Sequence, residues 1–84
     1  MTKSSDVARK AIIDVVNNQI RDGNPPETRE TFDRLVSEGL EKDEARRLIG
    51  CVVASEIFDI LKRRQPYDQE RYVKASRKLP ELPW

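Results

Sequence analysis

The chain contains no histidine and a single cysteine, Cys51, among its 84 residues. The missing histidine removes the commonest general base and the commonest metal ligand of proteins. One cysteine cannot form an intramolecular disulfide, and Cys51 falls in an apolar stretch where a thiol is usually a small buried side chain. We therefore expect no metal and no other cofactor, and we predict that the protein is not an enzyme.

Long apolar runs are also scarce. The longest, residues 48–61, is interrupted by Glu56 and Asp59 and is too short to cross a bilayer comfortably. The first seven residues lack the apolar core of a secretory signal. We expect a cytoplasmic protein without a membrane partner.

Charge is abundant but nearly balanced. Charged residues make up 37% of the chain and the net charge is +1, whereas an average globular domain has about 25% charged residues. The charges alternate with apolar residues at helical spacing, which indicates solvated helix surfaces rather than disorder. Residues 1–84 fit a single domain, and because so short a chain builds only a small core, oligomerisation would be a natural supplement.

The helical spacing of the apolar residues, together with the glycines, prolines and cap residues that separate the apolar stretches, predicts four helices. The first runs from about Ser5 to Asp22, the second begins at Pro26, and the third runs from about residue 43 to Arg64. The fourth follows Asp68, an expected N-cap. The sequence thus predicts an all-α fold, a compact bundle of about four helices, with an extended proline-rich tail over residues 79–84.

The stretch from residue 48 to residue 61 is apolar on nearly every side of a helix. Such a helix must be surrounded by protein, so we expect it to be the centre of the bundle. Gly50 sits inside it at a cost of about 1 kcal/mol relative to alanine, which suggests close contact with another helix. At the preceding turn, Gly39 is placed to form a Schellman motif that brings Leu35 and Leu40 together.

Glu56 is the one chemically interesting position of the central helix. It shares a face with apolar residues, and a buried carboxylate has to be paired, hydrogen-bonded or protonated. Gln19 and Arg9 of the first helix face inward and are the partners we expect. A polar pair that fixes helix register or a subunit contact is favoured over proton transfer, because no second catalytic group accompanies Glu56.

The basic residues concentrate toward the C-terminus. Seven basic and two acidic residues give residues 62–78 a net charge of +5, while eight acidic and three basic residues give residues 22–44 a net charge of −5. An alternative function is weak binding of nucleic acid or another anionic partner through this segment. A solvated face is favoured, and nucleic acid is an unlikely partner, because overall charge is near zero and aromatics are few. The basic cluster comprises Lys62, Arg63, Arg64, Arg71, Lys74, Arg77 and Lys78.

A wider pattern resembles short, uncharacterised bacterial helical proteins. The resemblance covers roughly residues 17–84. Its elements are Asn-Pro-Pro-Glu-Thr at 24–28, Leu35, Gly-Leu at 39–40, Glu-Ala at 44–45, Leu-Ile-Gly at 48–50, Glu-Ile at 56–57, Pro-Tyr-Asp at 66–68, Tyr72 and Leu-Pro at 79–80. The resemblance implies a bacterial source and an all-helical fold, and it implies no activity.

Together these features favour a protein that acts through protein–protein contact. Homodimerisation is the preferred form, because a small core and an apolar helix leave surface that one chain does not cover. The expected interface residues are Val53, Ile57, Leu61 and Trp84.

Overall fold

The computed structural model describes residues 3–82, and within that range the chain forms four α-helices and no strand. Their bounds are α1, Lys3–Asp22; α2, Pro26–Ser37; α3, Lys42–Arg63; and α4, Gln69–Lys78. The predicted all-α bundle is confirmed. The observed helix ends lie close to the expected ones because glycine, proline and Asp68 mark them in the sequence.

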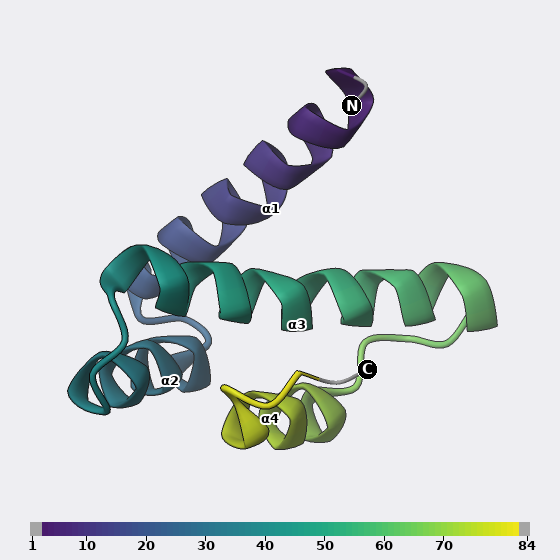
Figure 1. The fold of residues 1–84 in the computed structure, drawn as a ribbon. Helices are drawn as coiled ribbons and strands as arrows, with labels where there is room; N and C mark the ends of the chain where they lie inside the picture. Colours follow the sequence, from purple (N-terminus) through teal and green to yellow (C-terminus); the bar gives the residue numbers. More distant parts are fainter. Residues whose placement is uncertain (1–2, 83–84) are drawn as a thin grey trace.

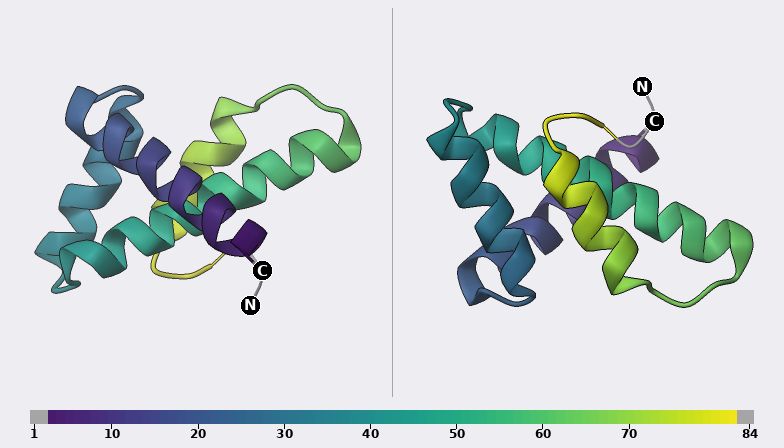
Figure 2. Two further views of the ribbon diagram at one scale, coloured as in Figure 1. Left: turned by 90° about the horizontal axis from the view of Figure 1, so that it is seen from above. Right: turned by 90° about the horizontal axis from the view of Figure 1, so that it is seen from below.

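Helix α3 is the central element. Helix α1 crosses one side of it, and α2 and α4 lie on the other side (Figures 1 and 2). All three other helices contact α3, and α2 also contacts α1 and α4. The buried apolar side chains come from all four helices and from the residue after α4: Val16, Phe32, Leu35, Ala45, Leu48, Ile49, Val52, Val53, Tyr72 and Leu79.

The crossing of α1 over α3 occurs at Gly50. A β-carbon built there would lie 3.4 Å from Ile12 Cγ2 and 3.6 Å from Ile13 Cδ1. The close helix contact expected at this glycine is therefore confirmed. Beyond the crossing the two helices diverge, and the N-terminal part of α1 rises away from α3 (Figure 1).

The turn between α2 and α3 is the predicted Schellman motif. Gly39 adopts φ +105°, a conformation that residues with a side chain rarely adopt. The Leu40 amide donates to the Leu35 carbonyl at 3.1 Å, and the Gly39 amide donates to the Val36 carbonyl at 3.0 Å. These two bonds satisfy carbonyls that the end of α2 would otherwise leave open.

The start of α4 also follows the sequence signals. The Asp68 side chain accepts a hydrogen bond from the Arg71 amide at 3.2 Å, which caps the helix. The rings of Tyr67 and Tyr72, on either side of this cap, have centroids 6.2 Å apart and are tilted by 50°. The two tyrosines therefore bracket the first turn as a hydrophobic staple would.

The described part of the tail is a turn rather than an extended strand-like segment. The Glu81 amide donates to the Lys78 carbonyl at 2.9 Å, which reverses the chain after α4. Leu79 is buried in the core, because the turn directs it back against the helices. Pro83 and Trp84 lie outside the described residues. No helix within residues 3–82 is long and apolar enough to cross a membrane.

Candidate interaction surface

The buried part of α3 ends at Glu56. Ile49 and Val52 are fully buried, whereas Ile57, Phe58 and Leu61 are 44%, 60% and 74% exposed. The central helix is therefore covered by its own chain up to Glu56, and its last two turns are partly open. The physical reason is the divergence of α1 from α3 beyond the Gly50 crossing, together with the position of α4, which leaves the end of α3 projecting (Figure 1).

Helix α1 presents a second exposed apolar face, which runs from its raised N-terminal half to just past the crossing. Val7 is 67% exposed, Val15 is 42% exposed, and Ala11 between them is also exposed. Residues four apart lie on one side of a helix, so these three form a continuous stripe. We call the exposed large side chains of the two helices and the following loop the apolar surface: Val7, Val15, Ile57, Phe58, Leu61 and Tyr67.

A groove of about 520 Å³ lies within this surface. Its walls are mainly apolar and come from α1, the α1–α2 turn with the start of α2, α3, and the segment before α4 with the first turns of α4. Val53 lies in it with only 8% of its surface exposed. The groove is lined by Val15, Gln19, Asn24, Pro25, Pro26, Val53, Glu56, Ile57, Ile60, Tyr67, Gln69 and Tyr72.

Glu56 lines this groove and is paired with Arg71 of α4. Arg71 Nε lies 2.9 Å from Glu56 Oε1 and 3.2 Å from Oε2, and Arg71 Nη2 lies 3.0 Å from Oε2. The carboxylate is 7% exposed and the guanidinium side chain 30% exposed. This two-pronged geometry is the strong form of a charged hydrogen bond, and it raises the pKa of Arg71.

The partner of Glu56 thus differs from the expected one. Gln19 is half-buried and accepts from the Thr28 hydroxyl at 2.9 Å, on the α2 side. Sequence reasoning assigned Arg71 to the basic cluster and so missed it. The sequence places Arg71 on the first turn of α4, three residues after the N-cap Asp68. Only the position of α4 against α3 brings it to Glu56.

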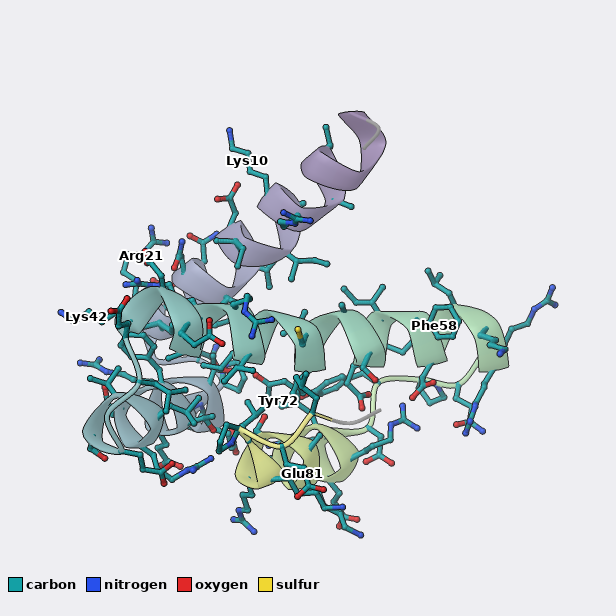
Figure 3. The ribbon with its side chains drawn as sticks, in the orientation of Figure 1. Lys10, Arg21, Lys42, Phe58, Tyr72 and Glu81 are labelled. Atoms are coloured by element: carbon teal, nitrogen blue, oxygen red, sulfur yellow. The ribbon has the colours of Figure 1, made fainter. Side chains whose placement is uncertain are left out.

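A buried hydroxyl chain connects α4 to α1 through α2. The Thr28 Oγ1 and Tyr72 hydroxyl oxygens are 2.5 Å apart, and both residues are buried. Because the Thr28 hydrogen is directed to Gln19 Oε1, Tyr72 donates to Thr28. Burial raises the pKa of Tyr72. Figure 3 shows Tyr72 between α4 and α3.

Arg34 is a second arginine that sequence analysis overlooked. Its Nη2 donates to the carbonyls of Ser76 and Leu79 at 3.1 and 3.0 Å, and its Nη1 donates to Glu38 at 2.9 Å. The guanidinium thereby caps the C-terminal end of α4, where carbonyls lack helical partners and a cation is favoured.

The seven residues of the basic cluster do not gather at one place. Arg71 is engaged by Glu56. The exposed residues Lys62, Arg63 and Arg64 lie at the end of α3, and Lys62 lies over the Phe58 ring at 5.3 Å. The exposed residues Lys74, Arg77 and Lys78 lie on the later turns of α4, beside a separate shallow hollow. The two groups lie apart, one at the projecting end of α3 and the other on the later turns of α4, beside the middle of α3 (Figure 2).

The predicted interface residues fall into three situations. Ile57 and Leu61 are exposed. Val53 is 8% exposed and belongs to the core, and it also lines the groove. Trp84 lies outside the described residues.

This surface offers apolar contacts, and the polar groups of Glu56 and Tyr72 in the groove are already engaged within the protein. Both oxygens of Glu56 are engaged by Arg71, and the Tyr72 hydroxyl is engaged by Thr28. Among residues 3–82 no three cysteine or acidic side chains come together in a way that could hold a metal ion. The remaining open surface consists mainly of aliphatic and aromatic side chains.

Comparison of the chain with family models, with curated proteins and with solved structures finds no match in any of the three. The resemblance to short bacterial helical proteins therefore stays a prediction, and the function has to be argued from the geometry.

Proposed function

We propose that this protein acts by protein–protein contact, as a non-enzymatic cytoplasmic domain, through the apolar surface of α1 and α3. The observation that carries the proposal is the exposure of Ile57, Phe58 and Leu61 in the last two turns of α3, where Ile57 lines the apolar groove. Scattered single apolar residues are normal on a protein surface, whereas a contiguous group next to a groove marks an interaction site.

The energetic argument concerns what a partner would gain. Covering a large apolar side chain contributes about 1.5–3 kcal/mol relative to leaving it in water. Phe58 and Leu61 are 60% and 74% exposed, so most of that gain is still available to a partner. Tyr67, 52% exposed on the opposite wall of the groove, adds an aromatic ring of the kind enriched at interfaces.

The alternative, binding of an anionic partner through the basic cluster, has weaker support. Arg71 is engaged within the protein, and the other six residues form two separate groups. Binding of nucleic acid rests on several cations that contact neighbouring phosphates along one strand or groove. Lys74, Arg77 and Lys78 provide three such cations on one helix, a small set for that purpose.

Site-specific photo-crosslinking in living cells tests the proposal. Phe58 is replaced by a photoreactive phenylalanine analogue, and Lys74, an exposed residue of α4 outside the apolar surface, carries the same analogue as the matched control. We expect a discrete protein adduct from position 58 and none from position 74. Absence of a protein adduct at position 58, or equal adducts at both positions, would overturn the proposal.

A further inference from the structure

We infer that the partner on this surface is a second copy of the same chain, arranged so that the α1 stripe of each copy packs against the exposed end of α3 of the other. The inference rests on the proposed function and goes further by naming the partner and the pairing of the helices.

The first argument is the amount of surface. The chain exposes 6060 Å² for a mass of 9.8 kDa. A compact monomer of that mass is expected to expose about 5,200 Å². The excess, roughly 900 Å², is close to the ~800 Å² that each partner buries in a stable interface of standard size. The fold therefore carries about one interface more surface than a self-sufficient monomer of its size.

The second argument is the match between the two halves of the surface. The α1 stripe consists of the small side chains Val7, Ala11 and Val15, and the end of α3 carries the larger Phe58 and Leu61. Small and large residues interdigitate well when two helices pack. Within one chain Val15 already lines the groove together with Ile57. The N-terminal part of α1 rises away from α3 (Figure 1), and Val7 stays 67% exposed, so the stripe is not covered along its whole length.

A dimer with a twofold axis would cover both halves of the surface. An isologous dimer uses the same patch on both copies, so each contact is made twice, with the α1 half of one copy facing the α3 half of the other. This requires the two halves to adjoin on each copy, and they do so at the groove, which Val15 of α1 and Ile57 of α3 both line. Four helices, two from each copy, would then enclose Phe58 and Leu61 in a common apolar layer.

Sedimentation equilibrium of the full chain tests the inference. We expect a dimer at micromolar concentration that salt does not weaken between about 0.05 M and 0.5 M, because the contact is apolar and not ionic. Val7→Glu and Leu61→Glu should each raise the dissociation constant by at least about tenfold. Asn17→Glu, which adds the same charge on the opposite, exposed face of α1, should leave it unchanged. Circular dichroism and thermal melting confirm that the variants fold.

Crosslinking between differently labelled copies tests the pairing of the helices. In a Cys51→Ser background, a Val7→Cys chain mixed with a Leu61→Cys chain should form a crossed adduct with a short bismaleimide. The pair Asn17→Cys and Leu61→Cys is the control and should form little or none. Equal yields from the two pairs would overturn the proposed arrangement.

The two proposals fail in different ways. A monomer at about 200 µM, well above the dissociation constant of a typical interface of this area, would overturn the second-copy inference. The proposed function would still stand if the position-58 adduct in cells contained another protein. A monomer in solution combined with no adduct at position 58 would overturn both. A dimer that neither Val7→Glu nor Leu61→Glu weakens would place the contact elsewhere and overturn the inference.

Discussion

Arg71 of α4 holds both carboxylate oxygens of Glu56 of α3, through Nε at 2.9 Å and 3.2 Å and Nη2 at 3.0 Å. The pair sits at the edge of the apolar groove and joins two helices that are connected only by an exposed segment, residues 64–68. Its role is to allow a carboxylate to lie in the core and to fix α4 against α3.

Removing the cation should therefore harm the fold more than removing both members. In Arg71→Met the Glu56 carboxylate stays buried without its partner, and such a charge is costly. We expect Arg71→Met to lower the melting temperature more than the double variant Glu56→Leu/Arg71→Met. Thermal denaturation of the two variants, with the single variant Glu56→Leu alongside, measures the difference. A double variant less stable than Arg71→Met would contradict this account of the pair.

Glu56→Gln keeps the shape of the side chain but removes its charge. The amide oxygen can still accept from Arg71, so we expect a modest loss of about 1 kcal/mol in the free energy of unfolding. Urea denaturation at neutral pH measures it. A stability equal to that of the natural chain would indicate that the charge of Glu56 contributes nothing to the fold.

Tyr72→Phe should reduce stability and change its pH dependence. Loss of the hydroxyl bond to Thr28 should cost about 1 kcal/mol at neutral pH. Because burial raises the pKa of Tyr72, the folded state holds the phenol proton more tightly than the unfolded chain does. That contribution is fully present below the unfolded pKa of about 10 and is lost as pH rises through the folded pKa.

The natural chain should consequently lose more stability than Tyr72→Phe between about pH 9 and pH 11. Tyr67 is present in both proteins, and the burial that raises its pKa is common to them. The part of that rise that comes from the charge of Tyr72 is lost in Tyr72→Phe, so it belongs to the same difference. Chemical denaturation at several pH values gives the two slopes. Parallel slopes would show that Tyr72 is not the titrating group.

Arg34→Ala should weaken the end of α4. The substitution removes two hydrogen bonds from a guanidinium to the Ser76 and Leu79 carbonyls, and we expect a loss of about 1–2 kcal/mol. Arg29→Ala, an exposed arginine on the same helix, is the matched control and should change little. Amide hydrogen exchange of α4 reports the effect locally, and equal exchange in both variants would argue against a capping role.

Gly50 tests the crossing of α1 over α3. In Gly50→Ala the new methyl group would lie at ordinary contact distance from Ile12 and Ile13, and the helix gains up to about 1 kcal/mol of propensity. We therefore expect unchanged or slightly raised stability. Gly50→Leu overfills the crossing and should cost about 1–3 kcal/mol. Equal melting temperatures for the two variants would mean that the helices do not pack closely there.

Much of the fold could be predicted from the sequence because its signals are local. Gly39 and the Asp68 cap act within one turn of their positions, and their hydrogen bonds form as the pattern predicts. Gly50 also marked a contact, since a glycine inside a stable helix needs a packing reason.

The pairing of Glu56 and the limits of the buried core could not be predicted in this way. Both depend on how the helices cross in space. A helical-wheel projection of α3 places Glu56 among apolar residues. Only the position of α4 in space decides that Arg71, and not Gln19, binds the Glu56 carboxylate. Likewise Val53 and Ile57 are equally apolar and one turn apart, and the divergence of α1 separates a buried residue from an exposed one.

The pairing of the α1 stripe with the end of α3 across two copies can be tested most directly by an isotope-filtered nuclear Overhauser experiment. Half of the chains carry labelled methyl groups and the other half are unlabelled, so only contacts between copies give signals. We predict cross-peaks from the Val7 methyl groups to Phe58 and Leu61 of the other copy. A sample at dimer-forming concentration that shows no such cross-peaks would contradict the account.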